Sequence, residues 1–277
     1  MLERIAKDSK GIIVYSKYIN LLFPNFRGKR EKIVAIGPHD DDPFIGAALL
    51  LYELRNLGTE VYVVIMTDGR KGYCKKKQKK YIVEIRKRET ENAYSLIGID
   101  KEYIKRFELP DSDLWKEAFK WENHEGKDDG LIAQLIKYFR EVGATRFLLP
   151  NDNDFHLDHQ ATFHSALYSL IQASEKIVPD FKGKSRRDSI LRYGVWSPFD
   201  GNPTHAIKTS QDTLDRKLEG LSSFKSQKQI EEIKNNIRNR GPYEFFQEFV
   251  VKSFPIEEYK KMFSGIEWKI NLLLQKR

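Results

Sequence analysis

The chain of 277 residues contains only one cysteine, Cys74, so an internal disulfide framework and a cysteine-rich zinc site are both excluded. Its longest apolar runs, such as GAALLLY and VYVVIM, are far too short to cross a bilayer. The N-terminal stretch lacks the basic start, the unbroken apolar core and the small-residue cleavage site of a secretory leader. We therefore expect a cytoplasmic protein without a membrane span.

The chain also lacks the short signatures that indicate nucleotide or RNA binding. No G-x-G-x-x-G follows the first predicted strand, and no aromatic RNA-binding signature is present. The positive charge is moderate, with 48 Lys and Arg against 40 Asp and Glu and a formal net charge of +8. Such an excess is compatible with an acidic substrate, a nucleic acid or an anionic membrane surface, and it selects none of them.

Much of the excess lies in residues 70–80, RKGYCKKKQKK, which contain no acidic residue. One interpretation of this basic stretch is a solvated loop. The other is a lid that attracts a sugar bearing phosphate or carboxylate. In the second case Arg70 and Lys71 are better placed than the later lysines to contact the substrate.

Apolar runs and helical patterns alternate along the first 175 residues. Turn residues end the apolar runs, and the helical segments repeat apolar residues at spacings of three and four. The predicted strands are 32–37, 60–69, 104–111 and 145–150, and the predicted helices are 42–58, 81–97, 131–143 and 156–174. This alternation predicts an α/β fold, a Rossmann-like, mostly parallel sheet with helices on both faces.

The pattern loosens after residue 175. We predict a strand at 190–196, a polar helical region at 210–240, an aromatic strand-like segment at 241–254 and a closing helix or strand at 266–277. The N-terminal residues 12–23 are apolar enough to pack on the domain or across a dimer, so a homo-oligomer is left open. Without a repeat or a clear linker, we expect one domain over residues 1–277, with its core at about 32–230.

Histidines and aspartates gather in two loops that each follow a predicted buried strand. The loops are PHDDDP, residues 38–43, and NDNDFHLDH, residues 151–159. Loops at the carboxyl ends of parallel strands meet at one edge of the sheet, where ligands bind. We therefore expect six side chains to converge at that edge: His39, Asp41, Asp42, His156, Asp158 and His159.

Two histidines and one aspartate can bind a divalent metal and leave a position open for water. A metal lowers the pKa of such a water from about 16 to about 7, and a neighbouring carboxylate can then take its proton. Each loop alone has a plainer interpretation, solvated charge for the aspartates and an incidental H-x-x-H for the histidines. Their joint placement after two separate strands favours a metal site.

These motifs resemble those of the LmbE-like/PIG-L family of metal-dependent N-acetylglucosaminyl deacetylases. PHDDDP is similar to the family's A-H-P-D-D-E, and HLDH matches its H-x-D-H. MTDGRKG resembles T-[ND]-G-x-x-G, and RKRETENAYSLIGI resembles R-x-x-E-x-x-x-A-x-x-x-L-G. ELPD and RKLEGLSSFKSQ also look like family segments, and the whole set follows the family order over about residues 32–230.

The resemblance implies a metal site formed by His39, Asp42 and His159. It also implies that the metal is zinc, although other divalent ions can occupy such a set of ligands. Asp41 would be the general base that activates water.

The other roles that the resemblance implies concern the substrate. His156 would stabilise the oxyanion or protonate the leaving amine, and Asp158 would orient a histidine of the site. Asp111, in ELPD, would contact the substrate, as a weaker inference.

The chain departs from the family pattern at two positions. Asp40 stands where the family usually has Pro, and Pro43 stands where it usually has Glu. We expect Asp40 to add negative charge beside the metal. Pro43 fits the first turn of a helix, where its missing N–H costs little.

The resemblance therefore implies a zinc-dependent hydrolase that removes the acetyl group from an N-acetylated amino sugar or sugar conjugate, with no nucleic-acid partner. The basic stretch 70–80 would suit an anionic conjugate. Two alternatives are left open: a metal-dependent hydrolase of another amide or ester, and a non-enzymatic Rossmann-like protein that binds a nucleotide or nucleic acid.

Overall fold

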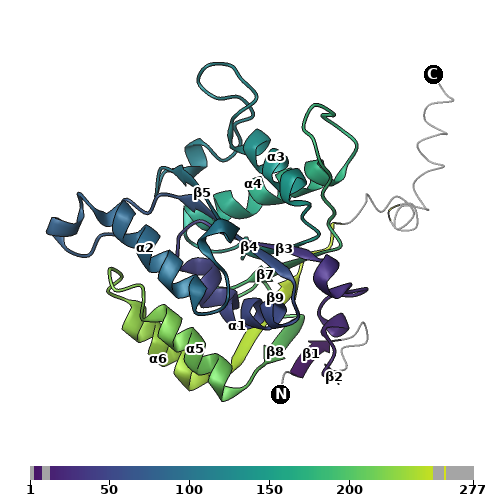
Figure 1. Cartoon of the computed structure of the whole chain (residues 1–277), viewed down its shortest axis with the longest axis vertical. Coiled ribbons are helices and arrows are strands. Elements are labelled where there is room, and N and C mark those ends of the chain that lie inside the picture. Colours follow the sequence, from purple (N-terminus) through teal and green to yellow (C-terminus); the bar gives the residue numbers. More distant parts are fainter. Residues whose placement is uncertain (1–2, 8–12, 252–258, 260–277) are drawn as a thin grey trace, which may run out of the picture.

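The structure is a computed structural model that describes residues 3–7, 13–251 and 259. Its centre is a nine-stranded sheet with the order β2-β1-β8-β9-β7-β6-β3-β4-β5 (Figure 1). Five neighbouring strands run parallel: β7 (Ser189–Tyr193), β6 (Arg146–Pro150), β3 (Lys32–Gly37), β4 (Glu60–Thr67) and β5 (Ile104–Leu109). An antiparallel extension continues the sheet: β9 (Tyr243–Glu248), β8 (His205–Lys208), β1 (Glu3–Lys7) and β2 (Ile13–Ser16).

Helices cover both faces of this sheet, as Figure 1 shows. One face packs against α1 (Asp42–Asn56), α2 (Ile82–Ser95), α5 (Gln211–Leu221) and α6 (Ile230–Arg240). The other face packs against α3 (Leu131–Val142) and α4 (Leu157–Ser174). Short 3-10 helices lie at Ile19–Leu21, Gly28–Arg30, Lys76–Gln78, Lys101–Tyr103 and Leu114–Lys116. Because successive side chains of a strand point to opposite faces, the apolar strands β3 and β6 contribute to both cores.

The order of the parallel strands reverses between β3 and β6. From β3 the chain proceeds outward through β4 to β5, and it then returns to β6 on the other side of β3 and continues to β7. The loops that follow β3 and β6 therefore leave the sheet side by side, at its carboxyl edge. Ligands bind at such a reversal in open α/β sheets, because the diverging loops leave a crevice there.

A buried ion pair fixes α1, whose first turn lies at this crevice. The Lys217 ammonium on α5 donates to Glu244 on β9, and their N–O distance is 2.6 Å. Glu244 also accepts the backbone N–H groups of Leu49 and Leu50, and Lys217 donates to the Ile45 carbonyl. The pair thus ties the antiparallel extension and α5 to the middle of α1 through hydrogen bonds that satisfy both charges.

The predicted fold class is confirmed, and each predicted strand and helix up to residue 174 is present within a few residues of its expected bounds. The region at 210–240 forms two helices, α5 and α6, and residues 241–254 contribute β9. The strands β1, β2 and β8 were not predicted, because they are short and carry little apolar pattern. The closing element at 266–277 lies outside the described residues.

The N-terminal segment has a divided role. Leu22 and Phe23 are buried in the core, in agreement with the expectation that this segment packs on the domain. Ile13 and Tyr15 are exposed on β2 at the edge of the sheet. Among the described residues, no helix has the length and apolarity needed to cross a membrane.

Candidate metal centre

The two loops predicted to converge do so where β3 and β6 end. The first loop places His39 and Asp41 just before α1, and Asp42 is the first residue of that helix. Pro43 lies in the first turn, as expected, where its missing N–H would have no intrahelical partner. The second loop leads from β6 into α4, whose first turn carries His159.

His39, Asp42 and His159 form a compact group of metal-binding atoms. One such atom from each residue lies within 4.8 Å of the other two. The Asp42 Oδ2 atom lies 3.0 Å from His39 Nδ1 and 3.3 Å from His159 Nε2, and it also accepts the His39 backbone N–H at 3.0 Å. His159 is fully buried, and neither of its ring nitrogens forms a hydrogen bond within the described part of the chain.

The charges of this group depend on one another. Burial alone would lower the pKa of His159, but the carboxylates of Asp42 and Asp154 outweigh it and raise that pKa to about 9. Burial likewise opposes protonation of His39, yet Asp42 and two other carboxylates raise its pKa well above the usual value. The two imidazoles in turn hold the pKa of Asp42 far below its ordinary range, against the effect of burial.

This arrangement fits a divalent cation. Buried ring nitrogens without a hydrogen bond and a carboxylate oxygen shared by two imidazoles are the donor set that zinc uses in proteins. A cation between these atoms would offset the Asp42 charge, as the imidazole protons do in the metal-free protein.

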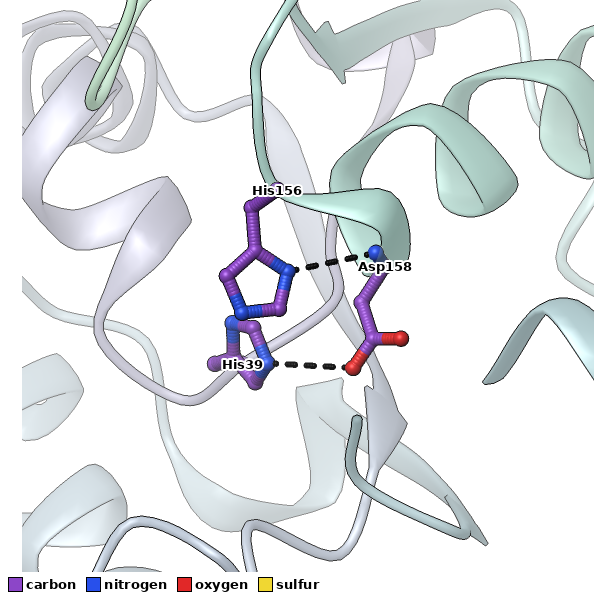
Figure 2. Close-up of side chains that lie close together, drawn as sticks. All are labelled: His39, His156 and Asp158. Atoms are coloured by element: carbon purple, nitrogen blue, oxygen red, sulfur yellow. Dashed lines mark hydrogen bonds and ion pairs between the residues drawn. The ribbon is translucent and has the colours of Figure 1, made fainter. Parts of the chain in front are cut away.

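Asp158 and His156 both lie beside His39 (Figure 2). Asp158 Oδ2 is 3.4 Å from His39 Nε2, and the Asp158 carboxylate accepts the backbone N–H groups of Ser112 and Leu114. These contacts place Asp158 where it can orient His39. His39, His156 and Asp158 form a second group of three potential metal ligands.

The protonation state of His156 follows from its place before α4. Its Nδ1 accepts the backbone N–H of Asp158 at 3.2 Å, so the proton of the neutral ring lies on Nε2. Burial lowers the pKa of His156, and the neighbouring His39 and His159 lower it further. A neutral imidazole with a free Nε2–H group is therefore available as a hydrogen-bond donor beside His39, whose ring centroid is 4.9 Å away.

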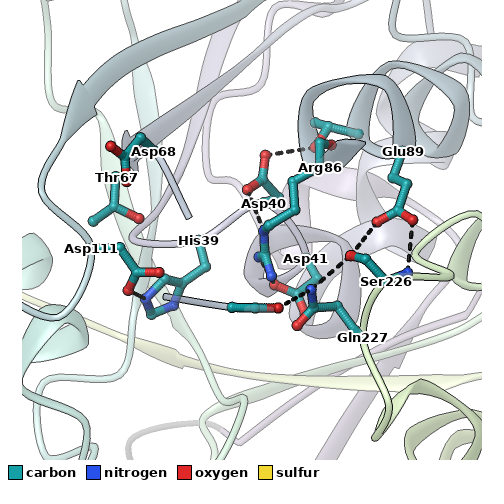
Figure 3. A network of polar contacts seen from close by, with 12 residues as sticks. His39, Asp40, Asp41, Thr67, Asp68, Arg86, Glu89, Asp111, Ser226 and Gln227 are labelled. Carbon is teal, nitrogen blue, oxygen red and sulfur yellow. Dashed lines mark hydrogen bonds and ion pairs between the residues drawn. The ribbon is translucent and has the colours of Figure 1, made fainter. Parts of the chain in front are cut away.

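Asp41 is held by a guanidinium group. Arg86 Nη2 lies 3.0 Å from Asp41 Oδ1, and both side chains are buried (Figure 3). Burial raises the pKa of Asp41, and the adjacent Asp42 adds to this rise while Arg86 opposes it. The result is a carboxylate next to the metal-binding group with a greater affinity for a proton than an ordinary aspartate.

The expectation that Asp40 adds charge beside the metal was wrong. Its carboxylate is fully buried and turned toward cations: it accepts from Arg86 Nε at 2.9 Å, from Thr90 Oγ1 at 2.6 Å, and from Arg106. These guanidinium groups hold its pKa far below the ordinary range even though burial acts in the opposite direction. Asp40 therefore balances two arginines rather than facing the metal-binding atoms.

Two glycines of the TDGRKG segment make room for Arg86. Gly69 has a φ of +68°, and a Cβ at that residue would lie 2.6 Å from Arg86 Nε. A Cβ at Gly72 would lie 2.6 Å from Arg86 Nη1. A larger residue at either position would displace the guanidinium group that binds Asp40 and Asp41.

A second link ties this part of the site to the loop between α5 and α6. Glu89, one helical turn after Arg86, accepts the backbone N–H and the hydroxyl of Ser226, each at 2.7 Å (Figure 3). The Gln227 side chain donates to the Gly72 carbonyl at 3.0 Å. These hydrogen bonds fix the FKSQ segment, residues 224–227, at the crevice, although this segment lies far along the chain from the two loops.

A cavity of about 320 Å³ opens onto these residues. It is lined by His39, Asp41, Asp42, Lys71, Gly72, Arg86, Asp111, Ser112, Phe155, His156, Trp196, Gln227 and Gln229. Of the three predicted substrate contacts, Lys71 and Asp111 line the cavity, and Asp111 accepts the Lys71 backbone N–H at 2.8 Å. Arg70 does not line it, because its guanidinium pairs with Asp68.

Sequence reasoning missed Asp154, Phe155 and Trp196. Asp154 is fully buried, and its Oδ2 lies 3.3 Å from His159 Nδ1, on the side of the ring opposite Asp42. A carboxylate in this position orients an imidazole that binds a metal. The loop NDNDFH contains two aspartates, and nothing in their spacing indicated which of them would face His159.

The sequence profile of the family described as GlcNAc-PI de-N-acetylase, PIG-L, matches residues 34–170, which include both loops. Over these residues the chain matches the PIG-L family. No curated protein sequence matches the chain.

Solved structures confirm the fold of this chain at low sequence identity. N,N'-diacetylchitobiose deacetylase from Pyrococcus horikoshii has a TM-score of 0.64 and 22% identity, over 79% of this chain and 84% of that one. The conserved protein TT1542 from Thermus thermophilus has a TM-score of 0.63 and 19% identity, over 80% and 97%. GalB, a 4-carboxy-2-hydroxymuconate hydratase from Pseudomonas putida, has a TM-score of 0.63 and 15% identity, over 81% and 98%. Since a hydratase shares the fold, the fold alone does not select the reaction.

Proposed function

We propose that the protein is a zinc-dependent hydrolase that removes the acetyl group from an N-acetylated amino sugar or sugar conjugate. One observation carries the proposal: the group of His39, Asp42 and His159 lies at a cavity that is also lined by a carboxylate, Asp41, and a neutral imidazole, His156. The match of residues 34–170 to the PIG-L family supports the same reaction class. A bound zinc ion would lower the pKa of a water molecule and polarise the amide carbonyl.

The residues of the chain supply the proton transfers. Asp41 accepts a proton from the attacking water, and its raised pKa favours this role. The Nε2–H group of His156 donates a hydrogen bond to the oxygen that becomes negative as water adds to the carbonyl carbon. As the C–N bond breaks, a proton passes to the amine nitrogen, and acetate and the free amino sugar leave.

Other residues hold these groups in place. Asp158 orients His39, and Asp154 orients His159. Arg86 keeps the Asp41 carboxylate from turning away from the cavity. Lys71, the second residue of the basic stretch 70–80, lines the same cavity. The positive charge of this stretch supports a substrate with an anionic group.

The function is tested by screening the metal-loaded protein for acetate release from N-acetylglucosamine and its conjugates. We expect Asp41→Asn to retain one equivalent of zinc and to lower kcat about 100-fold or more, because it removes the general base. Asp113→Asn is a matched control, since Asp113 is an exposed aspartate that pairs with Lys116 outside the cavity. Comparable turnover by Asp41→Asn would remove Asp41 from this role. A protein that binds no zinc and releases no acetate from any conjugate would contradict the proposed function itself.

A further inference from the structure

Two aromatic side chains stand at the mouth of the cavity that opens onto the metal-binding group. Phe155 is 71% exposed and Trp196 is 39% exposed, and both line this cavity. They come from the loops that follow β6 and β7, which are adjacent parallel strands. Large apolar rings left open to water beside a polar site are typical of a surface that a ligand covers.

Backbone hydrogen bonds hold the loops of both aromatic residues near the metal-binding group. The Trp196 backbone N–H faces Asp154 Oδ2 at 3.4 Å, and the Phe155 backbone N–H donates to Ser197 Oγ at 3.2 Å. Asp154 Oδ2 also lies 3.3 Å from His159 Nδ1. The same carboxylate thus touches a proposed metal ligand and the loop that carries Trp196, so the backbone of this loop has a defined position with respect to the metal-binding group.

Other residues form a polar wall of the same cavity. They are Lys71, Gln227 and Gln229, whose side chains offer hydrogen bonds and one positive charge. An amino sugar that reacts at the cavity floor presents hydroxyl groups around its edge, and these groups suit the polar wall. The aromatic wall instead suits the apolar face of a ring, either the C–H face of a sugar or an aryl group.

We propose that Phe155 and Trp196 form a subsite for a second ring that is joined to the reacting amino sugar by a glycosidic bond. This inference rests on the proposed function and narrows its substrate class to two-ring conjugates. The second ring packs on the aromatic side chains while the N-acetyl group lies at the metal-binding group. The ring can be a sugar or an aryl group, and the substrates used in the test distinguish the two.

The test compares three substrates of the zinc-loaded protein: N-acetylglucosamine, N,N'-diacetylchitobiose and p-nitrophenyl N-acetylglucosaminide. In Phe155→Ala and in Trp196→Ala we expect the ratio of kcat/KM for a two-ring substrate to that for N-acetylglucosamine to fall about 10-fold, mainly through KM. Phe155→Tyr and Trp196→Phe should restore the ratio, because both keep an aromatic face. Phe119→Ala is the matched control, since Phe119 is 64% exposed but does not line the cavity.

Each result has a defined consequence. A fall in the ratio for the chitobiose alone assigns the subsite to a sugar, and a fall for the aryl glycoside alone assigns it to an aromatic group. Ratios that stay within about 2-fold of the unaltered protein would overturn the subsite, as would an equal loss for N-acetylglucosamine, which would mean that the rings contact the reacting sugar itself.

A binding measurement separates this proposal from the proposed function. Titration of Asp41→Asn with each two-ring ligand should change the tryptophan fluorescence, and the double variant Asp41→Asn/Trp196→Phe should lose that change. If no substrate releases acetate but the fluorescence change persists, the reaction is wrong and the subsite stands. If acetate is released and neither the ratios nor the fluorescence responds to the aromatic residues, the reaction stands and the subsite is wrong.

Discussion

Replacement of Asp40 by asparagine should destabilise the protein strongly, although Asp40 is assigned no metal-binding or catalytic role. Its carboxylate is fully buried and binds Arg86, Thr90 and Arg106. Arg86 keeps Asp41 as a second partner, but the Nε and Nη2 atoms of Arg106 have no hydrogen bond within the described residues. Removing one partner of a buried ion pair costs about 3–5 kcal/mol, because the other charge is left uncompensated. We expect the free energy of unfolding of Asp40→Asn to fall by that amount.

Urea unfolding of the unaltered protein and four variants isolates the cause. Arg106→Met removes the cation that Asp40→Asn leaves alone, so the double variant should be more stable than Asp40→Asn by about 2 kcal/mol. Asp113→Asn, which alters an exposed ion pair, should change the stability by less than about 1 kcal/mol. If Asp40→Asn costs less than about 1 kcal/mol, or if its effect simply adds to that of Arg106→Met, the reasoning about the buried pair is refuted.

The pH dependence of stability gives a second check on Asp40. Its pKa in the folded protein is held far below the value of about 3.9 in an unfolded chain. A carboxylate with a lowered folded-state pKa stabilises the fold above the unfolded pKa, and this contribution is lost as the pH falls. Between pH 5 and pH 3, the free energy of unfolding should therefore decline less steeply in Asp40→Asn than in the unaltered protein.

Two further predictions concern metal binding and a buried arginine. His159, with its pKa raised to about 9, and His39, with its pKa raised well above normal, carry protons in the metal-free protein at pH 7. Zinc binding should therefore release about two protons at pH 7 and fewer above pH 9, as measured by calorimetry in buffers of different ionisation enthalpy; release of less than half a proton at pH 7 would contradict this. Arg140→Met should lower the free energy of unfolding by about 3 kcal/mol or more, since this side chain donates to backbone carbonyls between Gln172 and Phe181. Arg187→Met, which removes a partly exposed ion pair with Glu175, should cost less than about 1 kcal/mol in the same urea titration, and equal effects would refute the argument.

The convergence of the two loops could be predicted because strand ends are visible in the sequence. Apolar β-branched runs locate β3 and β6, and parallel strands bring their carboxyl ends to one edge. The proximity of His39, Asp42 and His159 follows from that topology. The role of each residue as a ligand stays a prediction until a metal is measured.

The antiparallel extension and the aromatic wall could not be predicted in the same way. A short strand such as β8, with the sequence HAIK, gains its stability from pairing with distant strands, and its own residues give little indication of that pairing. Phe155 and Trp196 lie in loops, where an aromatic residue has no periodic pattern that shows the direction of its ring. Their placement depends on Asp154, which bonds to one loop and lies beside a histidine of the other.

The charges of the three successive aspartates, Asp40 to Asp42, could be understood only from the structure. From the sequence, they were three like charges that one cation would offset. In the fold, the Asp42 carboxylate faces the imidazoles of His39 and His159, whereas Asp40 pairs with Arg86 and Arg106, and Asp41 pairs with Arg86. Arg106, which pairs with Asp40, lies on β5, 66 residues away along the chain, in a strand whose sequence gives no reason to expect a buried cation. Since Arg86 binds Asp40 and Asp41 together, the same guanidinium group offsets the charge of Asp40 and holds Asp41, the proposed base. An uncharged residue at position 40 would require a different partner for Arg106.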